Sequence, residues 1–210
     1  MIHLKEMRFN FGQVKRALLY GGWEPITAHD VYAALRLKPD YIINVTTAQD
    51  TIINREAING DHENVRGLAW DDDDFCGKTV EVAEQRGYKY FLAGSPTLIW
   101  DGKVQIDEAG YDDSFLKHEK TNRSGMGISD NELILCFEDS AVTIDDFAQK
   151  MADAGCKYAI NIDGGGSTAI FKKGHGKAVA LNKKDDKKLC STWLGIYLRK
   201  ERKKRGAVHE

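Results

Sequence analysis

A run of three glycines, residues 164–166, constrains the fold most, because it directly follows a segment with the pattern of a buried strand. In that segment, residues 157–162, strand alternation places the two isoleucines on one face and Asn161 on the other, which Asp163 shares. Glycines allow a tight turn and a close approach to a ligand, with N–H groups open to anionic oxygens. The sequence therefore predicts a buried strand that delivers an amide and a carboxylate to a tight turn.

Two interpretations of this turn remain open: a ligand site, and a structural β-turn in which Asp163 accepts local backbone hydrogen bonds. Three other kinds of glycine-rich site are excluded. The turn lacks the spaced Gly-Lys-Ser/Thr ending of a Walker loop and the Gly-x-Gly-x-x-Gly fingerprint of dinucleotide-binding proteins. A serine-hydrolase elbow needs Gly-x-Ser-x-Gly, whereas Ser167 is followed by Thr168 and Ala169.

The second half of the chain alternates strand-like segments with one well-marked helix. Thr143 is the expected N-cap of this helix, Asp146 completes a spacing like that of a capping box, and Gly155 ends the helix. Asp101 and Gly102 form a strong hairpin signal. Strands are expected at residues 97–100, 104–106, 127–128, 132–137, 157–162, 168–172 and 192–198.

The first half has weaker patterns. Thr27 is the expected N-cap of a helix that ends before Pro39, and Gly87 closes a shorter surface helix. We expect helices at residues 11–20, 27–37 and 78–85, strands at 41–47 and 88–92, and long loops at 48–74 with a turn at 59–61. The chain is thus predicted to be one α+β domain, residues 1–198, with a mixed, mostly antiparallel sheet covered by helices. Residues 199–210 form a basic tail that we expect to be solvated.

Composition and charge exclude several classes of protein. The 210 residues include 30 Lys and Arg against 32 Asp and Glu, a net charge of −2, whereas proteins built mainly to hold nucleic acid carry a basic excess. No apolar run approaches the roughly 20 residues that span a bilayer, and the first residues lack the plan of a signal peptide. We therefore expect a cytoplasmic protein with a small-molecule partner, and neither a membrane nor a nucleic acid as a partner.

No cofactor is expected, and no spacing of ligands indicates a zinc site. The four cysteines are scattered, without a Cys-x-x-Cys pair, and are expected to be reduced and mostly buried. His62, His118 and His175 are isolated in the sequence. The acidic run at residues 71–74 could bind a hard cation, which leaves a divalent metal open. Because that run lacks the alternating ligands and the glycine of an EF-hand loop, a solvated acidic loop is favoured.

The run at residues 161–168, Asn-Ile-Asp-Gly-Gly-Gly-Ser-Thr, resembles the signature of the phosphodiester glycosidase family. Four further segments resemble parts of that family in the same order, at residues 93–103, 123–128, 143–147 and 191–196. The resemblance covers residues 88–198, and its specific part is the Asp-Gly-Gly-Gly-Ser/Thr core. A small, stand-alone member of this kind would suit a phage or prophage gene.

This resemblance implies a hydrolase that cleaves a glycosidic bond to a phosphate-bearing leaving group. The best-known member of the family is the uncovering enzyme, which removes N-acetylglucosamine from a mannose-phosphate diester. The family's Asn-Gly-Gly-Phe/Tyr-Phe segment is reduced here to Asn44 at a strand end, which implies a rebuilt wall on the sugar side. Two alternatives therefore stay open: a nucleotide-like glycosyl phosphate as substrate, and a protein that binds a sugar phosphate or nucleotide without turnover.

The resemblance and the chemistry of the residues together assign roles. Asp163 is the acid/base or ligand-orienting carboxylate, and Arg123 is the phosphate ligand, since a guanidinium can hold two phosphate oxygens. Glycosidic cleavage ordinarily uses two carboxyl groups, and Glu138 is preferred over Glu108 as the second. The alternatives are a structural salt bridge for Arg123 and an exposed strand-end charge for Glu138. The further substrate-binding positions are Asn44, Asn161, Gly164, Gly165, Gly166, Ser167 and Thr168.

Overall fold

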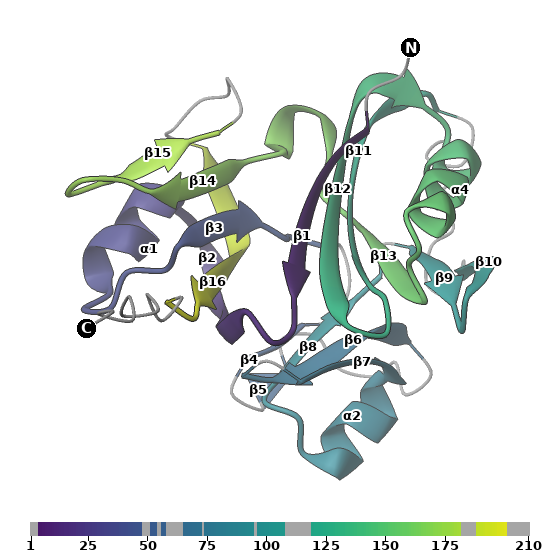
Figure 1. Ribbon diagram of the computed structural model, residues 1–210, viewed down its shortest axis with the longest axis horizontal. Helices are drawn as coiled ribbons and strands as arrows, with labels where there is room; N and C mark the ends of the chain where they lie inside the picture. The colour runs from purple at the N-terminus through teal and green to yellow at the C-terminus, as the bar shows by residue number, and fades with distance from the viewer. Residues whose placement is uncertain are drawn as a thin grey trace, which may run out of the picture.

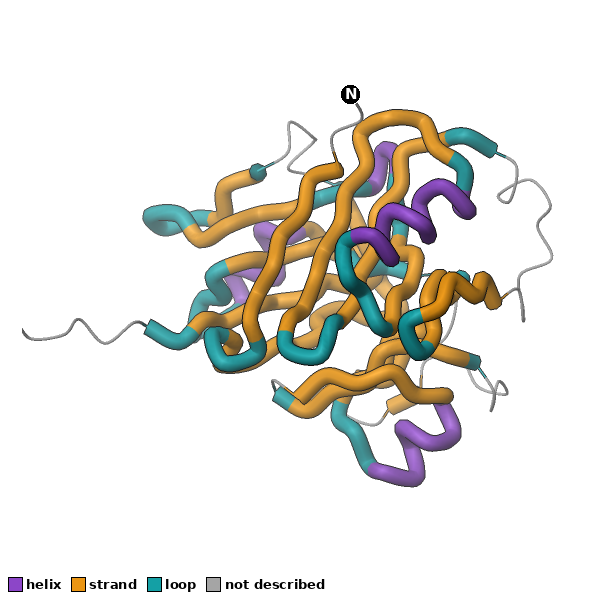
Figure 2. The backbone as a smooth tube through the Cα atoms, turned by 45° about the vertical axis from the view of Figure 1, so that its right-hand side comes forward, coloured by secondary structure: helices purple, strands orange, loops and turns teal. Residues whose placement is uncertain are grey.

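The structure of the chain is a computed structural model that describes residues 4–47, 51–53, 56–57, 65–72, 74–94, 96–107, 119–181 and 188–200. Among these residues every strand pairing is antiparallel, and the strands form three sheets, called sheets A, B and C below. Strands make up most of the described backbone, with short helices on the outside (Figure 2). The predicted α+β class with mostly antiparallel pairing is confirmed.

Sheet A contains the strand that was predicted to carry the site. Its order is β1 (Leu4–Asn10), β12 (Glu132–Val142), β11 (Thr121–Ile128), β13 (Tyr158–Ile162), β9 (Thr97–Trp100) and β10 (Lys103–Asp107). Helix α4 (Ile144–Asp153) covers the outer face of this sheet (Figure 1), where Phe147 and Met151 pack against buried strand residues.

Sheets B and C are built in the same way, each with a helix on its outer face (Figure 1). The order in sheet B is β15 (Ala178–Ala180), β14 (Ile170–Lys173), β3 (Tyr41–Asn44), β16 (Leu189–Leu198) and β2 (Val14–Thr27), covered by α1 (Ala28–Ala34). The order in sheet C is β5 (Glu56–Ala57), β4 (Thr51–Ile53), β8 (Tyr90–Ala93), β6 (Arg66–Asp71) and β7 (Asp74–Thr79), covered by α2 (Val80–Arg86).

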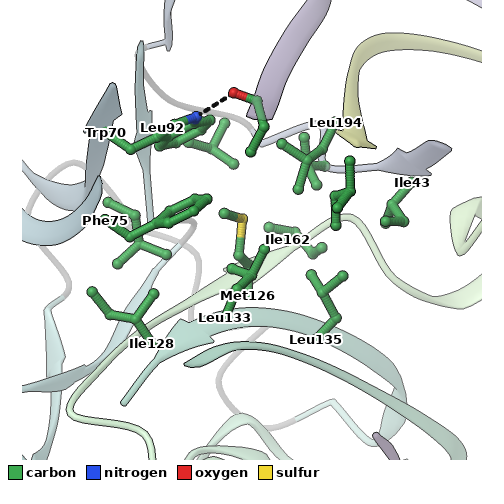
Figure 3. Packing of buried hydrophobic residues seen from close by; sticks show 14 of the residues in the cluster. Ile43, Trp70, Phe75, Leu92, Met126, Ile128, Leu133, Leu135, Ile162 and Leu194 are labelled. Carbon is green, nitrogen blue, oxygen red and sulfur yellow. Dashed lines mark hydrogen bonds between the residues drawn. The ribbon is translucent and has the colours of Figure 1, made fainter. Parts of the chain in front are cut away.

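The inner faces of the three sheets share one apolar core (Figure 3). Trp70 of sheet C, Met126 of sheet A and Leu194 of sheet B are each fully buried in it. The indole Nε1 of Trp70 donates a hydrogen bond to the carbonyl oxygen of Ala17 at 2.8 Å, which satisfies the one polar atom of that side chain. Burial of the inner faces therefore joins the sheets into one unit.

Capping residues set the helix ends as the sequence indicated. The Thr143 hydroxyl accepts from the backbone N–H of Asp146 at 3.1 Å at the start of α4. Thr27 forms a complete capping box at the start of α1, although this helix ends at Ala34, before the expected boundary. Gly87 closes α2 in the left-handed conformation, with φ 74°. The hairpin between β9 and β10 turns at Asp101 and Gly102, both with positive φ, as predicted.

The helix expected at residues 11–20 is wrong, because most of this segment forms the first half of strand β2. The cause is a bulge in the pairing with β16, where Arg16 lies opposite Tyr197 but Val14, not Lys15, lies opposite Leu198. The extra residue separates the buried positions Val14 and Ala17 by three instead of two. That spacing imitates the apolar face of a helix.

The long loops expected at residues 48–74 are also wrong in part, because β4, β5 and β6 lie within this range. Strand β6 is a central strand of sheet C and is buried on both faces, so it lacks the apolar–polar alternation of a half-buried strand. The turn expected at residues 59–61 lies outside the described residues. In the acidic run, Asp71 at the end of β6 pairs with Asp74 at the start of β7, and Asp72 has φ 38°.

Two other expectations concern composition. All four cysteines are free: Cys136, Cys156 and Cys190 are buried and Cys76 is half-buried, as expected. None of the helices in the described ranges is long and apolar enough to cross a membrane.

Candidate functional site

The glycine turn carries the chain from sheet A to sheet B. Strand β13 ends at Ile162, a short 3₁₀ turn, η1, spans Gly165–Ser167, and β14 begins at Ile170 in the other sheet. Gly165 has φ +55°, a conformation that residues with a Cβ rarely adopt. The turn therefore connects two sheets, and its backbone geometry favours glycine at position 165.

The strand before the turn has the predicted orientation. Ile160 and Ile162 point into the core between the sheets, whereas Ala159 packs on the α4 side of sheet A. By alternation Asn161 shares the face of Ala159, and it is 9% exposed. Its side chain is thus delivered to the face opposite the apolar core.

Strand β11 brings Arg123 to the same place. In the antiparallel register Gly125 pairs with Asn161 and Ser124 pairs with Ile162, so Arg123 is level with Asp163, the first residue after β13. Arg123 is 4% exposed, and its Nη2 donates to the carbonyl oxygen of Glu119 at 2.9 Å. A guanidinium buried to this degree is held in a fixed position, which suits a binding group better than a solvated surface charge.

The glycine turn packs directly on the backbone of β11. A Cβ on Gly164 would lie 2.6 Å from the carbonyl oxygen of Asn122 and 3.1 Å from the Cα of Arg123. Further along, the hydroxyl groups of Ser124 and Thr168 are hydrogen-bonded at 2.8 Å. The structure therefore brings Arg123 next to the start of the turn, although 40 residues of sequence separate Arg123 from Asp163.

A second segment, residues 44–46 at the end of β3, holds the turn from the other side. The backbone N–H of Asp163 donates to the carbonyl oxygen of Thr46 at 2.9 Å. At the far end of the turn, Asn44 Nδ2 donates to the carbonyl oxygen of Ser167 at 2.8 Å. Asn44 thus lies at the predicted site, where its amide contacts the backbone of the turn.

Glu138 lies beside Arg123 but is held by other partners. The two residues are opposite each other in the β11–β12 ladder. Glu138 Oε1 accepts from the backbone N–H and the hydroxyl of Ser140, and Oε2 is paired with the ammonium of Lys150 on α4. Burial favours the neutral acid, but the hydrogen bonds from Lys150 and Ser140 outweigh it and lower the pKa of Glu138. With its side chain 1% exposed, Glu138 is not the exposed strand-end charge that the sequence left as an alternative.

Asp163 also acts electrostatically on sheet B. Burial raises the pKa of the Cys190 thiol to about 11, and the negative charge of Asp163 adds to that rise. Cys190 is in β16, so the carboxylate of Asp163 lies near enough to this strand to influence a side chain on it. The site is therefore bordered by β11 on one side and by β3 and β16 on the other.

Other candidates from the sequence lie elsewhere or outside the described residues. Glu108, His62 and His118 fall outside them, and His175 is exposed between β14 and β15. Within the described ranges, no group of three or more His, Cys, Asp or Glu side chains is arranged to hold a metal ion. The acidic hairpin uses Asp71 to accept from the backbone N–H of Lys89 at 2.9 Å.

Sequence reasoning missed Thr46, Ser191 and Thr192. The hydroxyl of Thr46 accepts hydrogen bonds from the Ser191 hydroxyl and from the backbone N–H of Thr192. A signal for Thr46 was available, because Asn-x-Thr is a spacing at which an asparagine side chain accepts from the residue two positions ahead. Nothing in the local sequence connects this segment to residues 191–192, since about 145 residues lie between them.

Comparison with known proteins decides the family. The sequence profile of the phosphodiester glycosidases matches residues 29–197, which is well over half of the chain. The chain belongs to the phosphodiester glycosidase family. A comparison with curated proteins finds no match. The match begins at residue 29 and so includes much of the first half of the chain, whereas the resemblance seen in the sequence covers residues 88–198.

Solved structures show the same fold at low sequence identity. The catalytic domain of zebrafish N-acetylglucosamine-1-phosphodiester alpha-N-acetylglucosaminidase, auto-inhibited by its pro-peptide, matches with a TM-score of 0.66 and 15% identity, over 93% of this chain and 84% of that chain. A hypothetical protein from Synechocystis matches with a TM-score of 0.69 and 12% identity, over 93% of this chain and 59% of that chain. Family and fold together support a hydrolase of the phosphodiester glycosidase kind.

Proposed function

We propose that this protein hydrolyses the glycosidic bond between a sugar and a phosphodiester. The observation that carries the proposal is the packing of the glycine turn on β11. This packing places Gly164 against the backbone of Arg123, and the strand register puts Asp163 opposite Arg123. A carboxylate, a buried guanidinium and a glycine turn with one exposed residue, Gly166, suit a sugar–phosphate junction. The name of the zebrafish relative, a phosphodiester glucosaminidase, agrees with this class of substrate.

In the proposed reaction, water adds to the anomeric carbon while the bond from that carbon to the phosphate oxygen breaks. The phosphodiester leaves as a phosphate monoester with the bonding electron pair, and the proton of the attacking water passes to the carboxylate of Asp163. A phosphate leaving group needs little protonation. A single carboxylate is then sufficient, which agrees with the engagement of Glu138 by Lys150 and Ser140.

Arg123 and the turn would hold the leaving group. A guanidinium can bind two phosphate oxygens at once and keeps its charge throughout the working pH range. Gly166 is exposed, and a Cβ there would meet no atom within 4 Å, so the backbone of this part of the turn is accessible to a ligand. Charge that develops on the phosphate would be stabilised by groups that are already in place.

The test is product analysis on a panel of sugar 1-phosphodiesters, extended to sugar nucleotides because a nucleotide-like glycosyl phosphate remains an alternative substrate. Release of free sugar and an intact phosphate monoester by the wild type, and not by Asp163→Asn, would support the proposal. Cleavage of a phosphorus–oxygen bond instead would contradict it.

A second candidate function is binding without turnover, which the engagement of Glu138 would favour if the reaction needed two carboxylates. Glu138, the second carboxylate indicated by the sequence, is committed to an ion pair with Lys150. If the panel is bound and recovered intact under conditions in which the protein is folded, the protein is a binding module for sugar phosphates or nucleotides. Arg123 and the glycine turn would be needed in either case.

A further inference from the structure

Residues 44–46, at the end of β3, contact both ends of the glycine turn through Asn44 and Thr46. We propose that Asn44 and Thr46 form a clamp that fixes the turn in its ligand-binding conformation. Within it, Thr46 is a positioning residue that acts on Asp163 through its hydroxyl. The proposal deepens the proposed function and rests on it for its kinetic consequences. Its structural part can be tested whether or not the protein turns over any substrate.

The amide of Asn44 works as a bridge inside the protein. Asn44 is 2% exposed, and its Nδ2 donates to the carbonyl oxygen of Ser167 at 2.8 Å. Its Oδ1 accepts from the backbone N–H of Thr46 at 3.0 Å and from the Thr46 hydroxyl at 2.8 Å. The two acceptor places of the amide oxygen and one N–H of the amide nitrogen are thus used by the protein, and these bonds assign Asn44 to holding the turn.

Thr46 connects Asn44 to strand β16 and to Asp163. Its hydroxyl accepts from the backbone N–H of Thr192 at 3.2 Å and from the Ser191 hydroxyl at 3.3 Å. Together with the bond that it donates to Asn44, this hydroxyl fills its one donor and two acceptor places. The carbonyl oxygen of Thr46 accepts from the backbone N–H of Asp163 at 2.9 Å, so the position of this carbonyl fixes the position of the Asp163 backbone.

The turn needs such a clamp because of its composition. Glycine has more backbone freedom than any other residue, and three occur in succession at residues 164–166. A turn that moved freely would have to be ordered each time a ligand bound, which would weaken binding and misplace the groups around a transition state. Hydrogen bonds at Asp163 and Ser167 fix the two ends, while Gly165 and Gly166 between them stay accessible.

The test measures amide hydrogen exchange by NMR at Asp163 and Ser167, in variants of the full chain. Thr46→Val removes the hydroxyl but keeps the shape of the side chain, and Thr46→Ser keeps the hydroxyl. Asn44→Asp keeps the acceptor for Thr46 but removes the donor to Ser167. The matched control is Thr79→Val. Thr79 is the last residue of β7 in sheet C, and its hydroxyl caps α2, away from the turn.

Relative to core amides of β12, exchange at Asp163 should be about tenfold faster in Thr46→Val, and unchanged in Thr46→Ser and Thr79→Val, as expected for the loss of hydrogen bonds of ordinary strength. In Asn44→Asp the larger increase should occur at Ser167. Its N–H donates to the carbonyl oxygen of Gly164 inside the turn, so its exchange reports loosening of the turn when the Ser167 carbonyl loses the bond from Asn44. An unchanged rate at Asp163 in Thr46→Val would overturn the clamp, as would an equal rise at the core amides or in Thr79→Val. If Thr46→Val does not fold, Ser191→Ala, which removes one donor to this hydroxyl, is judged by the same criteria.

Kinetics test the positioning role separately. If the wild type turns over a sugar 1-phosphodiester, kcat should fall about tenfold in Thr46→Val with a smaller change in KM, and Thr46→Ser should restore it, because the orientation of Asp163 matters most in the transition state. A wild-type kcat in Thr46→Val would overturn the positioning role. A wild type that turns over nothing on the panel contradicts the proposed hydrolysis alone, and the exchange rates then decide whether the clamp exists.

Discussion

Alanine substitution at the three turn glycines should separate the demands of folding from those of binding. The three positions differ in what a Cβ would meet. At Gly164 it would clash with the carbonyl oxygen of Asn122 at 2.6 Å, and at Gly165 it would have to adopt φ +55°. At Gly166 it would meet no atom within 4 Å, and the φ of this residue lies outside the left-handed region. The same substitution should therefore have three different outcomes.

The magnitudes follow from these local geometries. Gly164→Ala should lower the free energy of unfolding by about 1–3 kcal/mol, because the backbone of β11 must move to make room. Gly165→Ala should cost about 1–2 kcal/mol of backbone strain. Gly166→Ala should be neutral or stabilise by about 0.4–1 kcal/mol, since it restricts the unfolded chain. For a chain of this size, 1 kcal/mol corresponds to a shift in Tm of roughly 2–4 °C.

Binding should show a different order. If the backbone at Gly166 approaches the ligand closely, a methyl group there should weaken binding by about 1–3 kcal/mol, or roughly 5- to 150-fold in Kd. Thermal melts and titrations with a sugar 1-phosphodiester, with inorganic phosphate as a simpler probe, measure both quantities on the same samples. If all three Ala variants bind like the wild type, the turn does not line the binding site. A wild-type Tm for Gly164→Ala would refute the packing of the turn on β11.

Three further predictions concern the charged residues. Asp163→Asn should abolish turnover at an unchanged Tm, because the amide keeps the shape but not the charge; turnover in this variant would remove Asp163 from the chemistry. Arg123→Lys should lower kcat/KM, with a loss of about 1–3 kcal/mol of transition-state stabilisation, and should weaken inhibition by inorganic phosphate. Normal kinetics in this variant would mean a structural role for Arg123. Lys150→Met should cost at most about 3–5 kcal/mol in urea unfolding, and addition of Glu138→Gln should recover most of it. Because the folded pKa of Glu138 is lowered, its stabilising effect is complete above the unfolded pKa of about 4.3 and disappears as the pH falls through the folded value. The stability difference between the wild type and the double variant should shrink in that acidic range, and loss of turnover in a folded double variant would restore Glu138 as a catalytic candidate.

Local signals in the sequence were sufficient wherever local physics decides the structure. Thr143 and Gly87 mark helix ends because a side-chain cap and a left-handed glycine act within one turn of a helix. Asp101 and Gly102 mark a hairpin because both positions require positive φ. Gly165 belongs to the same group, since its φ of +55° is one that residues with a Cβ rarely adopt.

Strand β2 shows where such reasoning fails. A bulge opposite β16 shifts the buried positions by one residue, and the resulting spacing of three between Val14 and Ala17 fits a helix as well as a strand. The information that selects the strand is in residues 189–198, at the other end of the chain. The prediction of a loop at strand β6 fails for a related reason. Burial on both faces of β6 depends on its neighbours in sheet C, so its sequence lacks the alternation of apolar and polar residues.

The same division runs through the candidate site. Arg123, Asp163 and the turn could be found because each carries a chemical type that the proposed reaction needs. The partners that decide how those groups behave come from distant segments: Lys150 commits Glu138 to an ion pair, and Thr192 and Ser191 hold the hydroxyl of Thr46. Residue chemistry thus points to what a side chain could do, whereas tertiary contacts decide whether it is available to do it. Of the two carboxylates that the sequence put forward, the ion pair with Lys150 leaves Asp163 as the better choice for the chemistry.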